Sequence, residues 1–275
     1  MSEDGIAAGV GRTALLLASA RAMETGRSGL VDDRFARLFV LAAGAPSGLP
    51  VELPAEETGT RQFWHDFALG AGLRSRFFDD FLLAHDGGQI VLVAAGLDSR
   101  SYRLNWSAGT KVFEIDQPAV LAFKGHVLAD EWAACTRCVV PVDLREDWAG
   151  VLQRSGFQPG EPTAWLLEGL MPYLSPTDVE TLLDRITNLS APGSSIALNH
   201  FSGIRSAPPL ADALDFDVLA LLQVEDQPDP AELLHRRGWS VTRSPSRDIA
   251  ALYDCEQSWR KKRLDVIGTG VTGTK

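Results

Sequence analysis

The pattern of apolar residues changes at about residue 89, and this change constrains the fold more than any other feature of the sequence. Beyond it, short and nearly continuous apolar runs alternate with helix-length segments of ten or more residues. Such runs are typical of parallel strands buried on both faces, and the intervening segments are typical of βαβ crossovers. The predicted strands cover residues 89–94, 111–115, 138–142, 164–167 and 195–199.

The segments on either side of these strands are predicted to be mostly helical. Helices are expected over 13–27, 32–43 and 63–82, with a loop rich in proline, glycine and acids over 44–59. After the fifth strand, the sequence predicts two helices within 206–237, a strand near Trp239, a helix over 250–260 and a last strand after Arg263. We therefore expect a doubly wound α/β core over 89–275, with a helical insertion at about 206–237. An N-terminal helical cap over 1–88 is expected to contribute to the active site.

Composition excludes several classes of partner. The 275 residues include 36 acidic and 26 basic side chains, a formal charge of −10, whereas nucleic acid and anionic membranes require a basic patch. No apolar stretch approaches the ~20 residues that span a bilayer. The start of the chain is acidic where a signal peptide would be basic, so a cytoplasmic protein is expected. Cys135 and Cys138 lack the second pair of a zinc site, and no metal is expected.

Ligands of doubly wound sheets bind beyond the carboxyl ends of the strands, so the residues that follow each strand are the candidate site. The first strand runs into the small residues Ala94, Ala95 and Gly96, which let backbone approach a ligand closely. Asp116 ends the second strand twenty residues after Gly96, the spacing at which an acid binds a ribose diol in nucleotide-binding folds. The alternative is that Asp116 caps the helix that begins near Pro118.

Two more carboxylates are predicted at the same rim of the sheet. Asp143 follows the third strand, where a carboxylate and a backbone N–H can pair with adenine, although Asp143 could equally cap the next helix. Glu168 follows the fourth strand. Three like charges in one cleft destabilise one another unless a cation or several hydrogen-bond donors lie between them.

Arg74 is the fourth element of this candidate site. It falls on a stripe of otherwise apolar or small residues at 63, 67, 70, 77 and 81, which is the face of one helix. An arginine on a buried stripe needs an anionic partner; the alternative is a side chain that extends outward to water. Acids for a ribose and an adenine, together with an arginine for a carboxylate, suit a zwitterionic, adenosine-based ligand such as S-adenosylmethionine.

Taken in order, these motifs resemble the leucine carboxyl methyltransferase family of class I S-adenosylmethionine-dependent methyltransferases. The bacterial members, which include polyketide O-methyltransferases, are the most similar branch. The resemblance covers residues 10–260 and rests on TALLLASARAMET, LRSRFFDDFL, VAAGLDSRSYRL, FEIDQPAVLAFK, PVDLREDW and WLLEGLMPYLS. It implies a Rossmann-like, mostly parallel seven-stranded sheet and S-adenosylmethionine as the cofactor.

The resemblance also implies a role for each motif residue. Arg74 would hold the methionyl carboxylate, Glu168 would lie against the methionyl or ribose part, and Asp116 would bind the ribose. The turn of Ala94, Ala95 and Gly96 would lie under the cofactor, and Asp143 with Leu144 would bind adenine. The family usually has Gly-Ala-Gly at this turn, so Ala94 is a departure that adds a methyl group near the ligand.

The expected activity is methyl transfer to a carboxylate or hydroxyl oxygen of a small molecule, a secondary metabolite. An ionised carboxylate needs no general base, whereas a phenol or enol would benefit from one. Tyr173 and His200 are the candidate catalytic residues, and Arg21 and Tyr173 the candidate contacts to the acceptor. The alternatives are a structural role for His200, a place in the core for Tyr173 and a solvated helix face for Arg21. The sequence leaves the oligomeric state open.

Two other functions compete with this one. A nicotinamide-dependent dehydrogenase needs Gly-x-Gly-x-x-Gly after the first strand, but the chain has this pattern only at Gly268, Gly270 and Gly273, with no room for a helix behind it. A cofactor-binding scaffold that does not methylate is the second competitor, and Ala94 gives it some weight.

Overall fold

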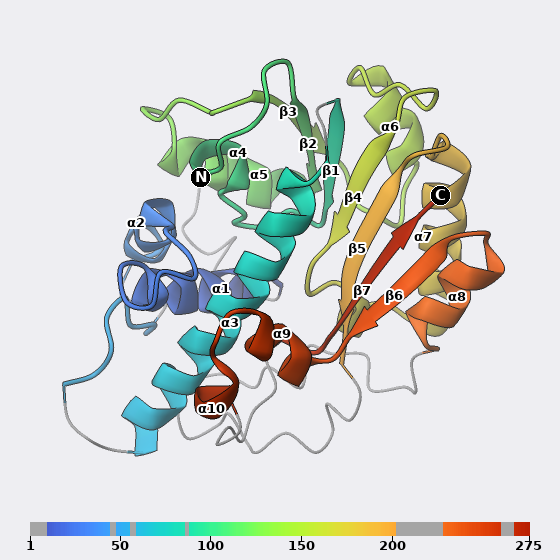
Figure 1. Cartoon of the computed structure of the whole chain (residues 1–275). Helices are drawn as coiled ribbons and strands as arrows, with labels where there is room; N and C mark the ends of the chain where they lie inside the picture. The colour runs from blue at the N-terminus through green and yellow to red at the C-terminus, as the bar shows by residue number, and fades with distance from the viewer. Residues whose placement is uncertain (1–9, 45–47, 56–58, 86–87, 202–227, 260–266) are drawn as a thin grey trace.

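A computed structural model describes residues 10–44, 48–55, 59–85, 88–201, 228–259 and 267–275 (Figure 1). Seven strands form one sheet in the order β3-β2-β1-β4-β5-β7-β6. The first five strands are parallel, and β7 is antiparallel to both β5 and β6. The predicted mostly parallel, Rossmann-like α/β sheet is therefore confirmed. The strands are β1 (Gln89–Val93), β2 (Lys111–Asp116), β3 (Thr136–Pro141), β4 (Thr163–Leu167), β5 (Ser195–His200), β6 (Ser240–Ser244) and β7 (Thr269–Thr274).

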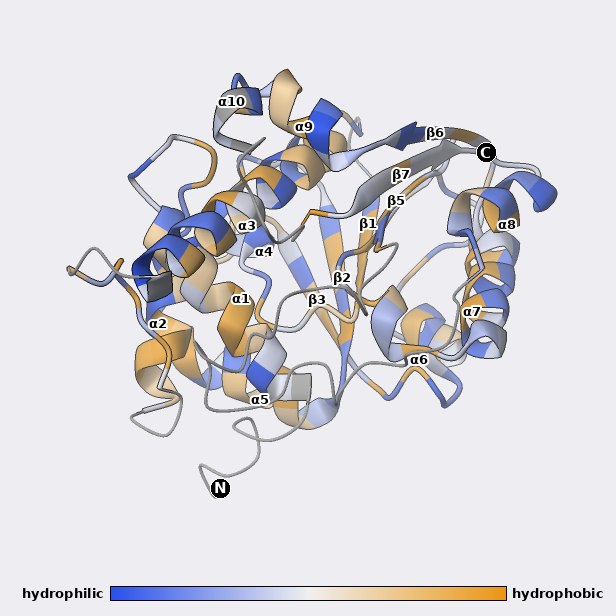
Figure 2. Cartoon of the chain, turned by 90° about the horizontal axis from the view of Figure 1, so that it is seen from below, coloured by the Kyte–Doolittle hydropathy of each residue, from blue (hydrophilic) through white to orange (hydrophobic). Residues whose placement is uncertain are grey.

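Helices cover both faces of this sheet, with α3 on one side and α6 and α7 on the other (Figure 2). The helices before β4 are α1 (Val10–Glu24), α2 (Arg34–Ala42), α3 (Gly59–Leu83), α4 (Arg100–Arg103), α5 (Pro118–Val127) and α6 (Trp148–Arg154). Those after β4 are the 3-10 helix η3 (Met171–Tyr173), α7 (Pro176–Leu189), α8 (Pro230–Arg236), α9 (Ser246–Leu252) and α10 (Glu256–Trp259).

Alternate residues of each strand supply the two cores, as the period of two in a strand requires. Val91 and Phe113 belong to the core that includes Trp148 of α6 and Leu183 of α7. Their strand neighbours Ile90, Leu92 and Val112 pack with Phe78 and Leu82 of α3 on the opposite face. Because both faces are covered, the strands needed the nearly continuous apolar runs by which the sequence revealed them.

Some predicted boundaries were wrong for local reasons. The chain leaves β1 one residue early because Ala94 has a φ of +56°, which a strand cannot contain. The single helix predicted over 250–260 is two short helices, α9 and α10, and Asp254 between them has a φ of +58°. Residues 202–227 lie outside the described part, and with them most of the predicted insertion; α8 is its described end.

Two sequence patterns set aside as false matches have structural roles. Gly270 lies in β7, where a Cβ would come within 2.7 Å of the Phe77 ring, and a Cβ at Gly273 would lie 3.2 Å from Ile196. These glycines therefore allow close packing around an antiparallel strand.

Cys135 and Cys138 contact the cores on opposite faces of the sheet, and burial raises the pKa of the Cys135 thiol to about 11.

No helix in the described part of the chain is long and apolar enough to cross a membrane. Among the same residues, no group of three or more His, Cys, Asp or Glu side chains could hold a metal ion.

Candidate active site

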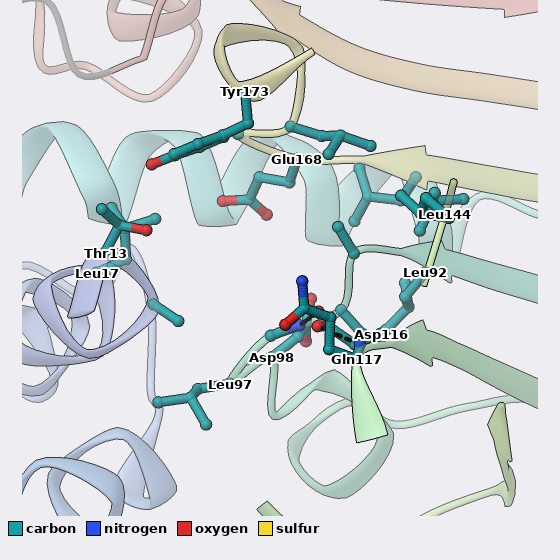
Figure 3. Close-up of a pocket in the computed structure, with 18 of the residues that line it drawn as sticks. Thr13, Leu17, Leu92, Leu97, Asp98, Asp116, Gln117, Leu144, Glu168 and Tyr173 are labelled. Carbon is teal, nitrogen blue, oxygen red and sulfur yellow. Dashed lines mark hydrogen bonds between the residues drawn. The ribbon is translucent and has the colours of Figure 1, made fainter. Parts of the chain in front are cut away.

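A cavity of about 530 Å³ opens at the carboxyl ends of the central strands (Figure 3). It lies where the strand order reverses between β1 and β4, the place at which open α/β sheets bind ligands. Helix α1 closes one side through Thr13, Ala14, Leu17 and Arg21. Of the residues that the sequence nominated, the cavity brings together Arg21, Arg74, Ala94, Ala95, Gly96, Asp116, Asp143, Leu144, Glu168 and Tyr173.

The turn after β1 forms the floor of the cavity. Ala94 and Gly96 have positive φ values, +56° and +48°, so the chain reverses sharply within three residues. The amide of Ala95 donates a 2.9 Å hydrogen bond to the Ile115 carbonyl, which ties the turn to β2. A Cβ at Gly96 would lie 3.5 Å from the Ala14 side chain, so the turn also packs against α1.

Asp116 is held by backbone amides from two segments. Its Oδ2 accepts a 2.6 Å bond from the Gly96 amide, and its Oδ1 accepts a 2.7 Å bond from the Gln117 amide. Gln117 is the N-cap of α5, so the alternative that Asp116 caps this helix is wrong. Burial raises the pKa of Asp116, although the two amide bonds act in the opposite direction.

Asp143 lines the cavity, and 22% of its side chain is exposed. It accepts bonds from the backbone amide, Nε and Nη2 of Arg145, at 2.9, 2.9 and 2.6 Å. The hydrogen bonds of Arg145 lower the pKa of Asp143. Asp147 caps α6, so the proposed alternative of a capping role for Asp143 is wrong.

Glu168 and Arg74 meet each other in the cavity wall. Arg74 Nε donates a 2.8 Å bond to Glu168 Oε1, and the arginine is only 3% exposed. The alternative of an outward-pointing Arg74 is therefore wrong. Arg100 Nη1 lies 2.8 Å from Glu168 Oε2. Burial acts to raise the pKa of Glu168, but Arg100 and Arg74 outweigh it, and the pKa is lowered.

Sequence reasoning missed Arg100, the centre of this ionic network. Its Nε donates a 2.6 Å bond to Asp79 Oδ1 on α3, and Nη1 also contacts Asp98. Arg103 binds the same Asp79 carboxylate through both terminal nitrogens, at 2.6 and 2.8 Å. Burial acts to raise the pKa of Asp98, but Arg100, Lys124 and Arg103 together outweigh it and lower the pKa to about 2. The spacing of Asp98 and Arg100 in the first βα loop was the one local signal for this network.

The expected repulsion among the rim carboxylates is largely relieved by the chain itself. Arg74 and Arg100 neutralise Glu168, and Arg145 neutralises Asp143. Asp116 instead receives two amide donors. The three acids therefore indicate a built polar site, but their charges do not by themselves require a cationic ligand.

Tyr173 closes the end of the cavity opposite Asp116. Its hydroxyl points toward Thr13 of α1 (Figure 3). Burial raises the pKa of Tyr173, and a side-chain hydrogen bond with Thr13 lowers it in part. The phenol therefore stays protonated near neutral pH and links η3 to the N-terminal cap.

Arg21 and His200, the remaining two candidates, are less well placed to contact a ligand. Arg21 lines the cavity, but its Nε lies 2.8 Å from Asp33 Oδ2 and its Nη2 donates a 2.8 Å bond to the Leu97 carbonyl. His200 ends β5 and is absent from the described residues that line the cavity. Burial lowers the pKa of His200, and Asp229, the N-cap of α8, acts in the opposite direction.

Residues 14–187, more than half of the chain, match the model of the leucine carboxyl methyltransferase family. A relative from Saccharopolyspora erythraea is 44% identical over 98% of this chain and 97% of its own length. One from Rhodococcus jostii is 42% identical over 90% of this chain and 88% of its own. Both bear the name "putative S-adenosyl-L-methionine-dependent methyltransferase".

Solved structures agree with this fold. A structure titled as a putative methyltransferase from Thermobifida fusca is 15% identical, with a TM-score of 0.52 over 99% of this chain and 97% of its own. The expected cofactor, S-adenosylmethionine, is confirmed by the match to relatives and family. The chain thus belongs to the leucine carboxyl methyltransferase family and is an S-adenosylmethionine-dependent methyltransferase.

Proposed function

We propose that this chain methylates a carboxylate or hydroxyl oxygen of a small molecule made in secondary metabolism. The observation that carries the proposal is the continuity of the cavity. One space of about 530 Å³ extends from the turn of Ala94, Ala95 and Gly96 to Tyr173, next to α1. Its size is within the range of small-molecule sites. The motif resemblance to bacterial O-methyltransferases supports the oxygen acceptor and the metabolite class.

The polar groups at the strand ends fit the cofactor. Asp116, fixed by two amides, would accept from the ribose hydroxyls, and Asp143 with the Leu144 amide would pair with adenine; all three residues line the cavity. The buried pair of Arg74 and Glu168 offers a cation to the methionyl carboxylate and a carboxylate to its ammonium group. Bound S-adenosylmethionine supplies a methyl group that is activated by attachment to a positively charged sulfur.

The acceptor would lie at the end of the cavity that α1 and η3 close. Leu17 and Leu174 give this end apolar walls, and Tyr173 offers a protonated phenol that can donate to an acceptor oxygen. Alignment of two bound reactants can lower a barrier by about 7–11 kcal/mol. We assign Tyr173 to acceptor contact and keep Arg21 as a second candidate contact. The catalytic role of His200 stays a prediction. Its position does not support that role, because His200 does not line the cavity.

The test has two stages. Titration calorimetry with S-adenosylmethionine and S-adenosylhomocysteine measures cofactor binding, and incubation with a library of carboxylic and phenolic acceptors, followed by mass spectrometry, measures methyl transfer. Tyr173→Phe should reduce turnover at least tenfold and leave the cofactor dissociation constant within about twofold of wild type.

Each outcome points to one function. Binding without transfer to any acceptor would favour the non-methylating scaffold, and methylation at nitrogen or carbon alone would refute the oxygen acceptor. Binding of NAD(H) in place of S-adenosylmethionine would favour the dehydrogenase. The structure gives this function no support, because Gly270 and Gly273 of the Gly-x-Gly-x-x-Gly pattern serve the packing of β7.

A further inference from the structure

A fully buried cation lies against strand β2. Lys124 of α5 has no exposed side-chain surface, and its Nζ lies 2.9 Å from Glu114 Oε2 on β2, which is equally buried. Glu114 also accepts from Arg137 Nε at 2.9 Å and from Ser101 Oγ at 2.7 Å. Two cations therefore share one carboxylate, and the cluster carries an excess positive charge that buried surroundings make costly unless an anion lies nearby.

Lys124 acts to lower the pKa of two carboxylates, Asp98 and Asp116, and Asp98 already pairs with Arg100. Glu114 and Asp116 are two residues apart on β2, so their side chains share one face of the sheet, about 7 Å apart along the strand. Helix α5 begins directly after this strand and folds back to bring Lys124 against Glu114. Consistent with this placement, Lys124 acts to lower the pKa of Asp116 and Glu114 acts to raise it.

Asp116 also differs from the other carboxylates in the strand-end loops. Asp98 and Glu168 contact Arg100, and Asp143 contacts Arg145. Asp116 has two amide donors and no ion pair among the described residues. The neighbouring acids in the loops after β1, β3 and β4 thus each have an arginine partner, whereas among the described residues Asp116 has no such partner and Lys124 acts on it from a distance.

We propose that Lys124 is a positioning residue that keeps Asp116 ionised, so that both carboxylate oxygens can accept hydrogen bonds from the cofactor's ribose. The inference rests on the proposed role of Asp116. A protonated Asp116 would lose acceptor capacity, because one oxygen would become a donor. Burial favours that neutral form, and the positive charge of Lys124 opposes it.

The test is the pH dependence of S-adenosylhomocysteine binding, measured by calorimetry from pH 5 to 8. Lys124→Met removes the charge and keeps the length of the side chain, and Glu114 retains Arg137 and Ser101. The pH below which affinity falls should rise by about one unit or more, as expected when a nearby opposite charge is lost. Near pH 8 the variant should approach wild-type affinity, and Lys124→Arg should keep the wild-type profile.

Arg137→Met is the matched control, since it removes the other cation from the same Glu114 carboxylate. It should lower stability without moving the pH profile. Lys124→Gln provides a second neutral variant, with the same shift expected. Carboxyl carbon NMR of the cofactor-free protein, labelled at aspartate, should show the midpoint of Asp116 rising in both neutral variants and unchanged in Arg137→Met.

The outcomes separate this inference from the proposed function. Folded neutral variants with the wild-type profile and the wild-type Asp116 midpoint would overturn the role of Lys124. If wild type binds S-adenosylhomocysteine and Asp116→Asn binds it equally well, the role of Asp116 itself is wrong. With both roles correct, Asp116→Asn binds at least tenfold more weakly, and its residual affinity shows little dependence on pH.

Discussion

Ala94 is strained at the point where the chain leaves β1. A φ of +56° brings its Cβ close to the following carbonyl, a conformation that costs about 1–2 kcal/mol for a residue other than glycine. The neighbouring Gly96, at +48°, adopts the same region without that cost. The turn therefore keeps a positive φ at position 94, as glycine would adopt there, although this chain has Ala94 in place of the first glycine of Gly-Ala-Gly.

We predict that Ala94→Gly raises the free energy of unfolding by about 1 kcal/mol, because relief of strain exceeds the added entropy of the unfolded chain. Urea denaturation measures the effect. The control is Ala95→Gly, at a buried residue without a positive φ, which should instead lower stability by a similar amount. Equal losses in the two variants would show that Ala94 is unstrained.

Arg74 gives a prediction about the cofactor. Arg74→Ala should weaken binding of S-adenosylmethionine by about 1.5–3 kcal/mol, the range for a hydrogen bond to a charged group, or roughly 10- to 150-fold in the dissociation constant. Glu168 keeps Arg100 in this variant, so the cavity wall retains one of its ion pairs.

Arg76→Ala serves as the control for Arg74, because Arg76 lies on the exposed side of the same helix and pairs with Asp80. Calorimetry should find its dissociation constant unchanged. An unchanged constant in Arg74→Ala as well would remove the assignment of Arg74 to the methionyl carboxylate.

At the scale of elements, Arg21 links α1 to two other parts of the site. Arg21 joins α1 to Asp33, which caps α2 through the Ala36 amide, and to the Leu97 carbonyl in the loop after β1. Asp33 is fully buried. Burial acts to raise the pKa of Asp33, but Arg21 and Arg103 outweigh it and the pKa is lowered.

Arg21→Met should therefore lower the free energy of unfolding by about 3–5 kcal/mol at pH 7, since it leaves a buried carboxylate without its closest partner. A group with a lowered pKa stabilises the fold above its unfolded-state value, and this contribution disappears as the pH falls through the folded-state value. The deficit should shrink accordingly when denaturation is repeated in acid.

The double variant Arg21→Met, Asp33→Asn tests the mechanism. Asparagine is a good N-cap, so this pair should recover much of the lost stability. If Arg21→Met unfolds like wild type at pH 7, the arginine is free for the acceptor, and the structural explanation fails.

For the whole molecule, β7 joins the antiparallel edge of the sheet to the helical layer. Gly270 faces Phe77 of α3 and Ile249 of α9. A Cβ at position 270 would lie 2.7 Å from the Phe77 ring and 3.2 Å from the Ile249 side chain. Gly270→Ala should cost roughly 1–3 kcal/mol of stability through overpacking. Gly125→Ala, in α5 with nothing within 4 Å of the new Cβ, should be neutral or stabilising by up to about 1 kcal/mol. Thermal denaturation compares them, and an unchanged melting temperature in Gly270→Ala would show that Phe77 and Ile249 make room for the new methyl group.

Local patterns in the chain were sufficient for the sheet and for much of the cavity wall. Strand positions followed from apolar runs, and Asp116, Asp143 and Glu168 followed from their place at strand ends. Arg74 followed from helical spacing. Each of these signals lies within about twenty residues of sequence, the range over which strand and helix periodicity act.

Which charged side chains meet depends on how the distant segments pack. Arg74 and Glu168 are 94 residues apart, and Arg100 and Glu168 are 68 apart. The hydrogen bond of Tyr173 with Thr13 likewise joins distant segments of the chain. An ion pair depends on distance in space and on burial, and neither is encoded in the spacing of residues along the chain. The sequence alone determined where the polar groups of the site would stand; the packing of α1, α3 and α5 around the sheet determined their partners.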